Sequence, residues 1–449
     1  MSRRAAPVRA REGTPALPVL TLQWLAFAVT NTLPVPFVLA AALHLSPTAE
    51  AALAGRIFLV TGLMSLAQAL FGHRLPIVEG PAGMWWGVFV SLAILAPAVD
   101  MSEAHLRAAL EFGMMTAGAF LLLAALWRRG IAALAALFTP AVTGALMILL
   151  PAQIAPSIAA ALIGSPPFLP GLLAGLATFL VVLLLAMLGT GIWRSASLLV
   201  GVAVGTMLWP VLGIPFKVMH AGPALAMPVP LAWGRPQFVP GVVAASLVTA
   251  FLLLSNLLAS LRAMQAVTGA HVTPDTVRRA IFVNGASIAV SGVFAVPGVI
   301  PYASNAGFIS LSRNSERLPF LLSSALLVLL GFVPAVGRFV VALPMPVVDA
   351  ALLASFGQLF AIGIADLARE GLGLSRSLVV MGPILLGMGI MGVPHSTWRS
   401  LHTPMAFLFG NGMIVGLLLM MLLLPFVRLA REESPDALDT EASHQGIPR

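Results

Sequence analysis

Two stretches of this sequence decide its fold, because each interrupts an apolar run in the same way. The first reads LPIVEGPAGMWWG (residues 75–87) and the second reads VIPYASNAGFISLSR (residues 299–313). Each begins as a short run with β-strand character, passes through Gly, Pro or Asn, and then resumes as a helix. The Ala82-Gly83 step lies 224 residues before the Ala306-Gly307 step in a chain of 449. The two breaks therefore occupy matching places in two halves.

The composition places both breaks inside a membrane protein. Hydrophobic residues make up 59% of the chain, charged residues only 9%, and the mean hydropathy is +1.01. A soluble domain would carry about a quarter charged residues. Apolar runs long enough to cross roughly 30 Å of hydrocarbon recur from Leu20 to Phe426. The absence of cysteine and the scattered histidines predict no metal site and no cofactor.

The net charge of +8 is explained by the membrane and not by a nucleic-acid partner. Most of the 24 Lys and Arg fall on one side of the bilayer when the N-terminus is placed in the cytoplasm, as the positive-inside rule requires. We therefore expect a multi-pass protein of the inner or plasma membrane with both termini cytoplasmic. Residues 1–19 are predicted to form a cytoplasmic tail, and the polar residues 429–449 a disordered one.

We predict an all-α polytopic protein of fourteen spans arranged as a 7+7 inverted repeat. The polar connection 214–237 separates seven spans in 20–213 from seven in 238–428. Because seven is odd, the second set enters the bilayer in the opposite orientation. The breaks shorten the third and tenth spans, residues 82–98 and 304–312, and we expect them to meet near the midplane as short strands followed by half-helices.

Paired interruptions of this kind point to the substrate site of a transporter. Backbone at bilayer depth without helical hydrogen bonds survives only where protein or a water-filled cavity satisfies it. The sequence contains no Gly-x4-Gly-Lys-Ser/Thr loop for ATP and no convergent nucleophile, acid and base. We therefore expect neither a primary pump nor an enzyme.

Four motifs resemble the nucleobase–ascorbate transporter family, also called nucleobase:cation symporter-2. The family signature is an acidic residue, Gln or Pro, followed by Asn-x-Gly, four residues, Thr and a basic residue. Here residues 304–313 read SNAGFISLSR with the same spacing. The other matches are Gln23-Trp24, where the family carries Gln-His, GHRLPIVEG at 72–80, and FVNG at 282–285. The set resembles a divergent branch that includes proteins named as purine permeases.

This resemblance implies both an architecture and an activity. A core of spans one to four and eight to eleven would move against a gate of spans five to seven and twelve to fourteen, with a homodimer contact through the gate. The function implied is a secondary active permease for a nucleobase, most plausibly a purine such as xanthine, uric acid or hypoxanthine, with uracil as the alternative. Proton symport is the family default, and Na⁺ is the alternative coupling ion.

The chain departs from the family at two acidic positions, which fall on Ser255 and Ser304. An uncoupled nucleobase facilitator therefore remains an alternative. A sulfate or bicarbonate transporter of the same fold is another, because two facing helix N-termini suit an anion. Glu79 at the first break and the lack of a basic residue there argue against it.

Glu79 is the sharpest single candidate, because an intramembrane carboxylate is expensive and by default functional. We expect it to couple protons or to bind substrate. The alternatives are a structural partnership with His73 or Arg74, or a cap for the half-helix. A second acid, Glu111, lies near the outer end of the predicted fourth span and has Arg107 four residues before it, the spacing of a local helical ion pair.

The remaining candidates surround the breaks. Amides carry both donor and acceptor and so match a nucleobase edge, whereas small residues let backbone groups approach the ligand. Met84 is flanked by Trp85 and Trp86, which either stack on a planar ring or anchor the membrane interface. A structural role for Asn305, which orders the second break, is the favoured reading. The full set of substrate-binding candidates is Asn31, Glu79, Gly83, Met84, Ser255, Asn256, Ala303, Ser304 and Asn305.

Overall fold

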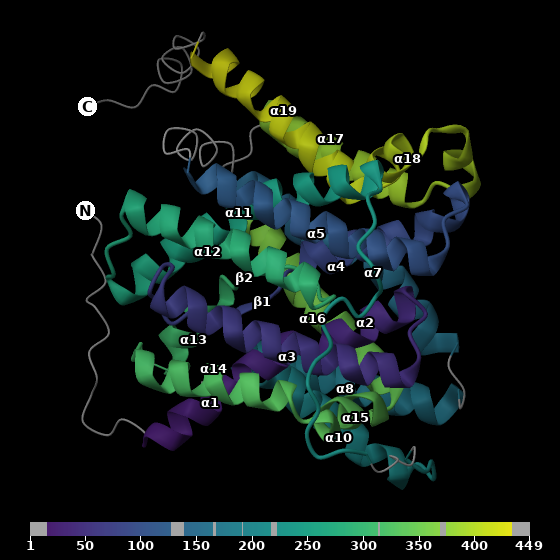
Figure 1. Ribbon diagram of the computed structural model, residues 1–449, viewed down its shortest axis with the longest axis vertical. Coiled ribbons are helices and arrows are strands. Elements are labelled where there is room, and N and C mark those ends of the chain that lie inside the picture. Colours follow the sequence, from purple (N-terminus) through teal and green to yellow (C-terminus); the bar gives the residue numbers. More distant parts are fainter. Residues whose placement is uncertain are drawn as a thin grey trace, which may run out of the picture.

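The computed structural model describes residues 16–126, 139–164, 168–190, 192–216, 222–312, 315–368 and 374–432. Within these ranges the chain is mostly helical (Figure 1). The predicted fifth span, 131–155, begins outside the described residues, and most of both predicted tails also lie outside them. Residues 429–432, which we assigned to the C-terminal tail, instead continue the last helix.

Three helices in the first half of the chain begin at proline, at Pro34, Pro47 and Pro140. Proline suits this position because it lacks the N–H that a first helical turn leaves without an intrahelical partner. Ser46 also caps α3 by accepting a hydrogen bond from Ala49 N at 3.3 Å. The elements are α1 (Leu17–Thr32), α2 (Pro34–Ala42), α3 (Pro47–Leu70), β1 (Glu79–Pro81), α4 (Gly83–Leu95), η1 (Ala96–Val99), α5 (Glu103–Leu126), α7 (Pro140–Gly164), α8 (Phe168–Leu188), α9 (Ile192–Ser195) and α10 (Ser197–Val211).

The second half follows the connection that we predicted at 214–237, which carries neither helix nor strand where it is described. Its elements are α11 (Pro240–Thr268), α12 (Pro274–Val293), β2 (Val299–Pro301), α13 (Ser304–Ser312), α14 (Arg317–Gly331), α15 (Pro334–Ala342), α16 (Met345–Ala368), α17 (Leu374–Met391), η2 (His395–Ser400), α18 (Thr403–Phe409) and α19 (Gly412–Glu432).

The described helices fit a membrane by length and composition. Seven of them, taking α1 and α2 together, are long and apolar enough to cross a bilayer, and the bent pair α14 and α15 would make eight. Both α4 and α13 are shorter because they begin only after a break. The expectation of a mostly helical polytopic protein is confirmed, whereas the count of fourteen spans stays a prediction.

Each interrupted stretch forms a three-residue strand followed by a helix, and the two strands pair. β1 and β2 are antiparallel, with Glu79 opposite Pro301, Gly80 opposite Ile300 and Pro81 opposite Val299. All six strand residues are buried. Figure 1 places the pair in the interior of the bundle, between α3 and α12. The strands therefore join the two halves of the chain at its centre.

The surrounding helices pack in reciprocal pairs. Around the strands, α12 packs against α5 and α14 against α3, while α11 contacts α5 and α1 contacts α14. Glycine permits the closest crossings: a Cβ on Gly118 of α5 would lie 2.4 Å from Ala289 N, and one on Gly62 of α3 would lie 2.6 Å from Ser324 O. A second group joins α7 and α8 to α16, α10 to α8, and α17 to α19.

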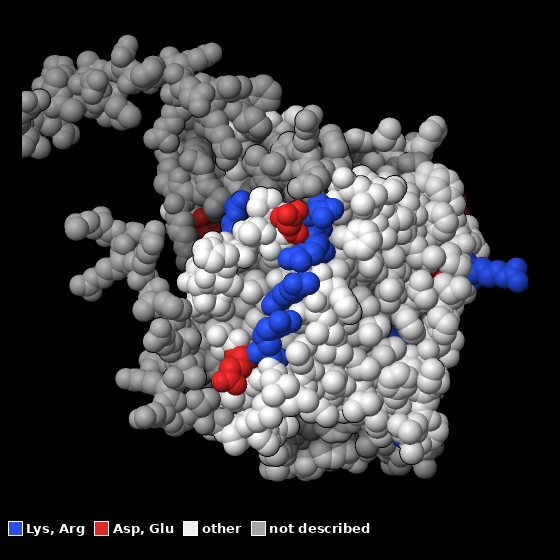
Figure 2. Space-filling model, turned by 60° about the vertical axis from the view of Figure 1, so that its left-hand side comes forward, with Lys and Arg blue, Asp and Glu red and all other residues white. Residues whose placement is uncertain are grey.

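Positive charge collects where α3 ends and where α12 and α14 begin. Arg317, the first residue of α14, donates to Ala69 O of α3, and Gln68 Nε2 donates to Ala280 O of α12 at 3.0 Å. These bonds bring Arg74, just after α3, near the arginines of the other two helices. Figure 2 shows a face on which Lys and Arg side chains form a row with acidic side chains at its ends. Such an arginine-rich end is what the positive-inside rule expects of a cytoplasmic surface.

Candidate functional site

Asn305 ties the two breaks together. Its Oδ1 accepts a hydrogen bond from Val78 N at 3.1 Å, and its Nδ2 donates to Tyr302 O at 2.6 Å. The backbones add two further bonds, from Tyr302 N to Val78 O at 3.1 Å and from Ala82 N to Gly298 O at 2.9 Å. Asn305 therefore links the two breaks through its side chain, which is the structural role that the sequence favoured.

Replacing Asn305 with Ala is expected to destabilise the protein by about 2 kcal/mol, because the buried Val78 N–H loses its acceptor. Thermal unfolding of the purified protein in detergent, followed by tryptophan fluorescence, measures this change. Asn305→Asp is the comparison variant, since it keeps an acceptor for Val78 but sets a carboxylate oxygen against Tyr302 O in place of the donor. An unchanged melting temperature for Asn305→Ala would show that the cross-link contributes nothing to stability.

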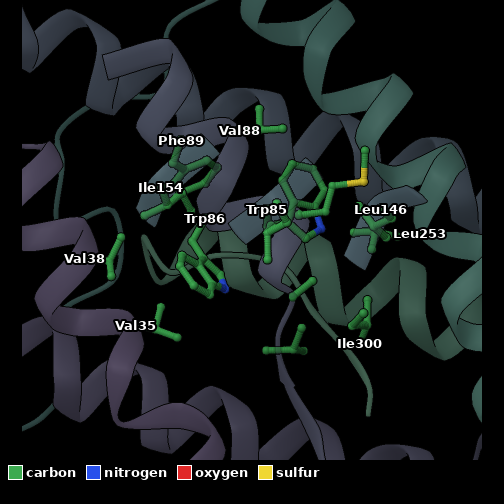
Figure 3. Packing of buried hydrophobic residues seen from close by; sticks show 14 of the residues in the cluster. Val35, Val38, Trp85, Trp86, Val88, Phe89, Leu146, Ile154, Leu253 and Ile300 are labelled. Carbon is green, nitrogen blue, oxygen red and sulfur yellow. The ribbon is translucent and has the colours of Figure 1, made fainter. Parts of the chain in front are cut away.

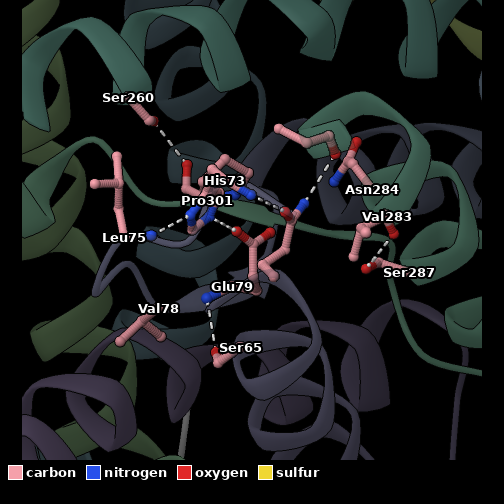
Figure 4. A network of polar contacts seen from close by, with 12 residues as sticks. Ser65, His73, Leu75, Val78, Glu79, Ser260, Val283, Asn284, Ser287 and Pro301 are labelled. Carbon is pink, nitrogen blue, oxygen red and sulfur yellow. Dashed lines mark hydrogen bonds and ion pairs between the residues drawn. The ribbon is translucent and has the colours of Figure 1, made fainter. Parts of the chain in front are cut away.

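Neighbouring helices satisfy the outer carbonyl groups of β2. Ser260 of α11 donates to Pro301 O at 2.8 Å (Figure 4). Asn284 of α12 donates to Val299 O at 3.0 Å. Backbone polar groups in a water-poor interior need such partners. The strand pair is thus held by side chains from both flanking helices, which fixes where α4 and α13 begin.

Glu79 lies wholly inside the protein at the first break. Its side chain is 0% exposed, Oε1 lies 3.2 Å from His73 Nε2, and its backbone N donates to Ser65 Oγ at 2.8 Å. The second oxygen, Oε2, is buried and has no hydrogen-bond partner in the described structure. Of the two structural partners that the sequence offered, the structure pairs Glu79 with His73, whereas Arg74 is exposed.

Tyr302 is a residue of the crossing that the sequence did not single out. Its ring lies over Gly80, where an added Cβ would come within 2.3 Å of the hydroxyl oxygen. The hydroxyl lies 3.3 Å from Asn31 O and 3.2 Å from Pro81 O, and its single proton can be donated to either carbonyl. It is the single tyrosine of the chain, a signal that could have drawn attention to it.

The other candidates from the sequence lie on elements that contact one another. α11 packs against both α4 and α13, and α1 contacts β1. The side chains of Asn31 and Ser255 turn back onto their own helices, donating to Phe27 O at 2.8 Å and Leu252 O at 2.6 Å. The remaining positions divide by exposure: Met84 and Asn256 are buried, Gly83 is half-buried, and Ala303 and Ser304 are exposed.

The first turn of α4 supplies backbone donors beside Glu79. Its N-cap, Ala82, has an extended backbone and no side-chain cap, and the first helical bond runs from Trp86 N to Ala82 O at 3.3 Å. Helix geometry therefore gives the N–H groups of residues 83–85 no intrahelical acceptor. Donors at such an N-terminus suit carbonyl oxygens or anionic groups of a ligand.

Residues of α7 and α16 face the same half-helix, and the sequence reading missed them. Gln153 Nε2 of α7 donates to Gly87 O at 3.1 Å, and a Cβ on Gly83 would meet Leu150 at 3.0 Å. Trp86 stacks on Phe356 of α16, with ring centroids 5.5 Å apart and planes 21° from parallel. A glutamine in an otherwise apolar span was the available signal for Gln153.

The two tryptophans of α4 are packed inside the protein and do not anchor a membrane interface. Trp85 is 0% and Trp86 6% exposed, and Figure 3 shows both rings within the cluster of buried side chains. A Cβ on Gly298 would lie 2.4 Å from Trp85 Nε1, an indole nitrogen that has no hydrogen-bond partner in the described structure. Trp24, at the position of the family histidine, packs against Phe308 of α13 with centroids 4.5 Å apart.

Two half-helices that begin from paired strands inside a bundle of apolar helices define a membrane transport protein. A family model described as "Permease family" (Xan_ur_permease) matches residues 16–396, so the chain belongs to that family, the nucleobase:cation symporter-2 permeases.

Individual relatives agree with this assignment over nearly the whole chain. "Putative purine permease YwdJ" of Bacillus subtilis is 29% identical, with 94% of this chain and 98% of YwdJ covered. Uric acid permease PucJ of the same organism is 24% identical, with 94% and 95% covered.

Solved structures show the same fold in anion transporters. The murine Slc26a9 anion transporter in the inward-facing state superposes with a TM-score of 0.60 at 14% identity, covering 93% of this chain and 69% of that one. The transmembrane domain of the cyanobacterial bicarbonate transporter BicA gives a TM-score of 0.56 at 15% identity, covering 83% and 96%. At these identities the likeness concerns the fold alone.

Proposed function

We propose that the protein is a secondary active permease for a nucleobase, most plausibly a purine such as xanthine, uric acid or hypoxanthine, in symport with protons. The observation that carries this proposal is the crossing itself, where the donor groups of α4 begin four residues after a buried carboxylate. A purine presents carbonyl oxygens and ring nitrogens that such donors and a carboxylate can bind. The purine and uric acid permeases among the relatives favour the same substrate class.

We propose that the substrate lies between the starts of α4 and α13, facing α7 and α16. The candidates Glu79, Gly83, Met84, Ala303, Ser304 and Asn305 belong to the two breaks, and Asn31, Ser255 and Asn256 to the adjoining helices. The helices around the strands would form the core, and α7, α8, α10 and α16 to α19 the gate, supported by their packing in two groups. We further propose fourteen spans in a 7+7 inverted repeat, cytoplasmic termini and a homodimer contact through the gate; the packing of the two halves around the strand pair supports the repeat.

Uptake into proteoliposomes tests the proposal. Radiolabelled xanthine uptake is measured with and without an inward proton gradient, against competing purines, uracil and sulfate. Competition by purines, together with stimulation by the gradient, is the expected result. Stimulation by a Na⁺ gradient but not by a proton gradient would identify Na⁺ as the coupling ion. Uptake that responds to neither gradient would identify the protein as an uncoupled facilitator.

The second candidate is an anion transporter, which the shared fold of Slc26a9 and BicA favours. A carboxylate buried at the break opposes it, because a negative charge beside the helix start repels an anionic substrate. Sulfate or bicarbonate uptake without competition by any nucleobase would establish this alternative and contradict our proposal.

Removing the bond between Gln153 and Gly87 is expected to shift the balance between transport conformations about fivefold. The bond joins a proposed gate helix to a proposed core half-helix, so movement of core against gate must break it, and one hydrogen bond is worth about 1 kcal/mol. The chain has no cysteine, so a single cysteine introduced at Ala303 reports accessibility to a membrane-impermeant thiol reagent without background. Equal labelling rates with Gln153 and with Gln153→Leu would contradict this expectation.

A further inference from the structure

Both ring nitrogens of His73 are engaged, and by partners of opposite character. The backbone N–H of Leu75 points at Nδ1, with 3.0 Å between the nitrogens, so Nδ1 must accept and carry a lone pair. Nε2 faces Glu79 Oε1 at 3.2 Å. A neutral imidazole bears one proton, and with Nδ1 accepting, that proton sits on Nε2 and is donated to the carboxylate. Figure 4 shows the ring between these two partners.

A second proton on this ring is opposed by its surroundings. Protonating Nδ1 would set one N–H against another at 3.0 Å, in a backbone segment fixed by the bond from Ile77 N to Leu75 O and by the bond from His73 N to Gln68 Oε1 at 3.3 Å. Burial of the imidazole opposes its charged form, and the positive charge of Arg317, from α14, adds repulsion. His73 itself is 0% exposed on its side chain.

The two carboxylate oxygens of Glu79 differ in their surroundings, because one has a hydrogen-bond partner and the other has none in the described structure. Among the described residues, three groups surround Glu79. The His73 imidazole, from the loop after α3, contacts Oε1, and Ser65 Oγ of α3 accepts from the backbone N of Glu79. The Tyr302 phenol interacts electrostatically with the carboxylate. Oε1 is occupied by the imidazole, whereas Oε2 has no partner in the described structure. A proton can therefore join or leave Oε2 without breaking the bond at Oε1.

We propose that His73 is a positioning residue that stays neutral as the Nε2–H tautomer throughout transport, so that this crossing carries a single exchangeable proton, on Glu79. The proposal rests on the proposed function and deepens it. One proton adds to the carboxylate at Oε2 from one side of the membrane and leaves it to water on the other side, while the imidazole neither gains nor loses one. The site accordingly contributes one proton for each substrate moved.

Two variants of His73 separate positioning from proton carriage. His73→Gln places an amide N–H where Nε2 stood, so it can still donate to Glu79 but cannot titrate. His73→Asn places an amide oxygen where Nδ1 stood, so it still accepts from Leu75 but cannot reach Glu79. We expect His73→Gln to retain proton-driven accumulation within about threefold, and His73→Asn to shift the pH of half-maximal uptake by about one unit, since losing a charge-assisted hydrogen bond costs roughly that much.

The same two His73 variants also provide the results that would overturn the proposal. If His73→Gln abolishes gradient-driven accumulation while substrate counterflow persists, the imidazole carries the proton. Counterflow and thermal unfolding, measured on both variants, identify any that simply fail to fold. If His73→Asn leaves the pH profile unchanged while His73→Gln changes it, the positioning role is wrong.

Nitrogen NMR on protein labelled with ¹⁵N-histidine tests the tautomer without any transport. The resonances of His73 are assigned by their loss in His73→Gln, which separates them from the other seven histidines. One bare and one protonated nitrogen, with the proton on Nε2, is the expected result between pH 5 and 8. An imidazolium or an Nδ1–H tautomer would overturn the inference even if xanthine uptake is confirmed. Conversely, failure of nucleobase uptake leaves the tautomer result standing.

Discussion

Glu79→Gln protein is expected to exchange substrate across the membrane but not to accumulate it. The glutamine keeps the shape and the Oε1 acceptor for His73 Nε2, so the crossing should stay folded. It removes the carboxylate that we propose binds and releases the coupled proton. A gradient of one pH unit, coupled to one proton, can drive at most about tenfold accumulation, because 1.4 kcal/mol corresponds to a factor of ten. We expect that ratio to fall to about one in the variant.

The measurement compares two assays on the same proteoliposomes. Accumulation under a proton gradient reports coupling, whereas counterflow of labelled against unlabelled xanthine reports binding and movement alone. Asp349→Asn is the matched control, since Asp349 is a buried carboxylate at the start of α16, outside the crossing. Normal accumulation by Glu79→Gln would eliminate Glu79 as the coupling residue, and loss of counterflow as well would make it a residue needed for substrate binding or folding.

Gly80→Ala is expected to abolish transport and to lower the yield of folded protein sharply. The added Cβ would lie 2.3 to 2.5 Å from three atoms of the Tyr302 phenol group, far inside van der Waals contact. The ring cannot retreat without breaking the contacts of its hydroxyl with Asn31 O and Pro81 O. Overpacking of a rigid interior typically costs about 1 to 3 kcal/mol, and here it also displaces both breaks.

Removing the tyrosine ring provides the control for this clash. Tyr302→Ala alone should weaken the crossing through its lost contacts, yet the double variant Gly80→Ala/Tyr302→Ala should be no worse than Tyr302→Ala. The two changes would then be strongly non-additive, as expected of groups in contact. Yields and melting temperatures of the four proteins complete the cycle. Additive losses would show that Gly80 is needed for another reason, such as its strand conformation.

Much of the architecture could be predicted because the membrane makes sequence unusually informative. The recurrence of apolar runs identified the helices, and the Gly/Pro/Asn interruptions located both half-helix starts to within a residue. β2 lies at the start of the second stretch as expected, whereas β1 begins at Glu79, four residues after the start of the first stretch. In lipid, backbone polar groups must be satisfied internally, so a broken apolar run has few structural solutions. Local chemistry also favoured the ordering role of Asn305.

Predictions from local sequence spacing were wrong where a residue distant in sequence supplies the hydrogen-bond partner instead. The interval between Arg107 and Glu111 favoured a pair along α5, but Glu111 Oε1 instead accepts from Trp233 N at 2.9 Å, in the loop before α11. Arg107 Nη1 donates to Leu43 O at 3.0 Å. The sequence likewise favoured Trp85 and Trp86 as anchors at the membrane interface. In the structure, neighbouring helices pack around α4 and both side chains are buried.

The sequence by itself determined that this chain is a polytopic membrane protein with two matched breaks, a carboxylate at the first, and the motifs of a nucleobase permease. Only the tertiary structure decided that Glu79 is held by His73, that Tyr302 covers Gly80, and that Gln153 and Phe356 face the same half-helix. The physical reason is range: hydropathy and helix breaking act within a few residues, whereas contacts such as Gln153 to Gly87 depend on how whole helices pack.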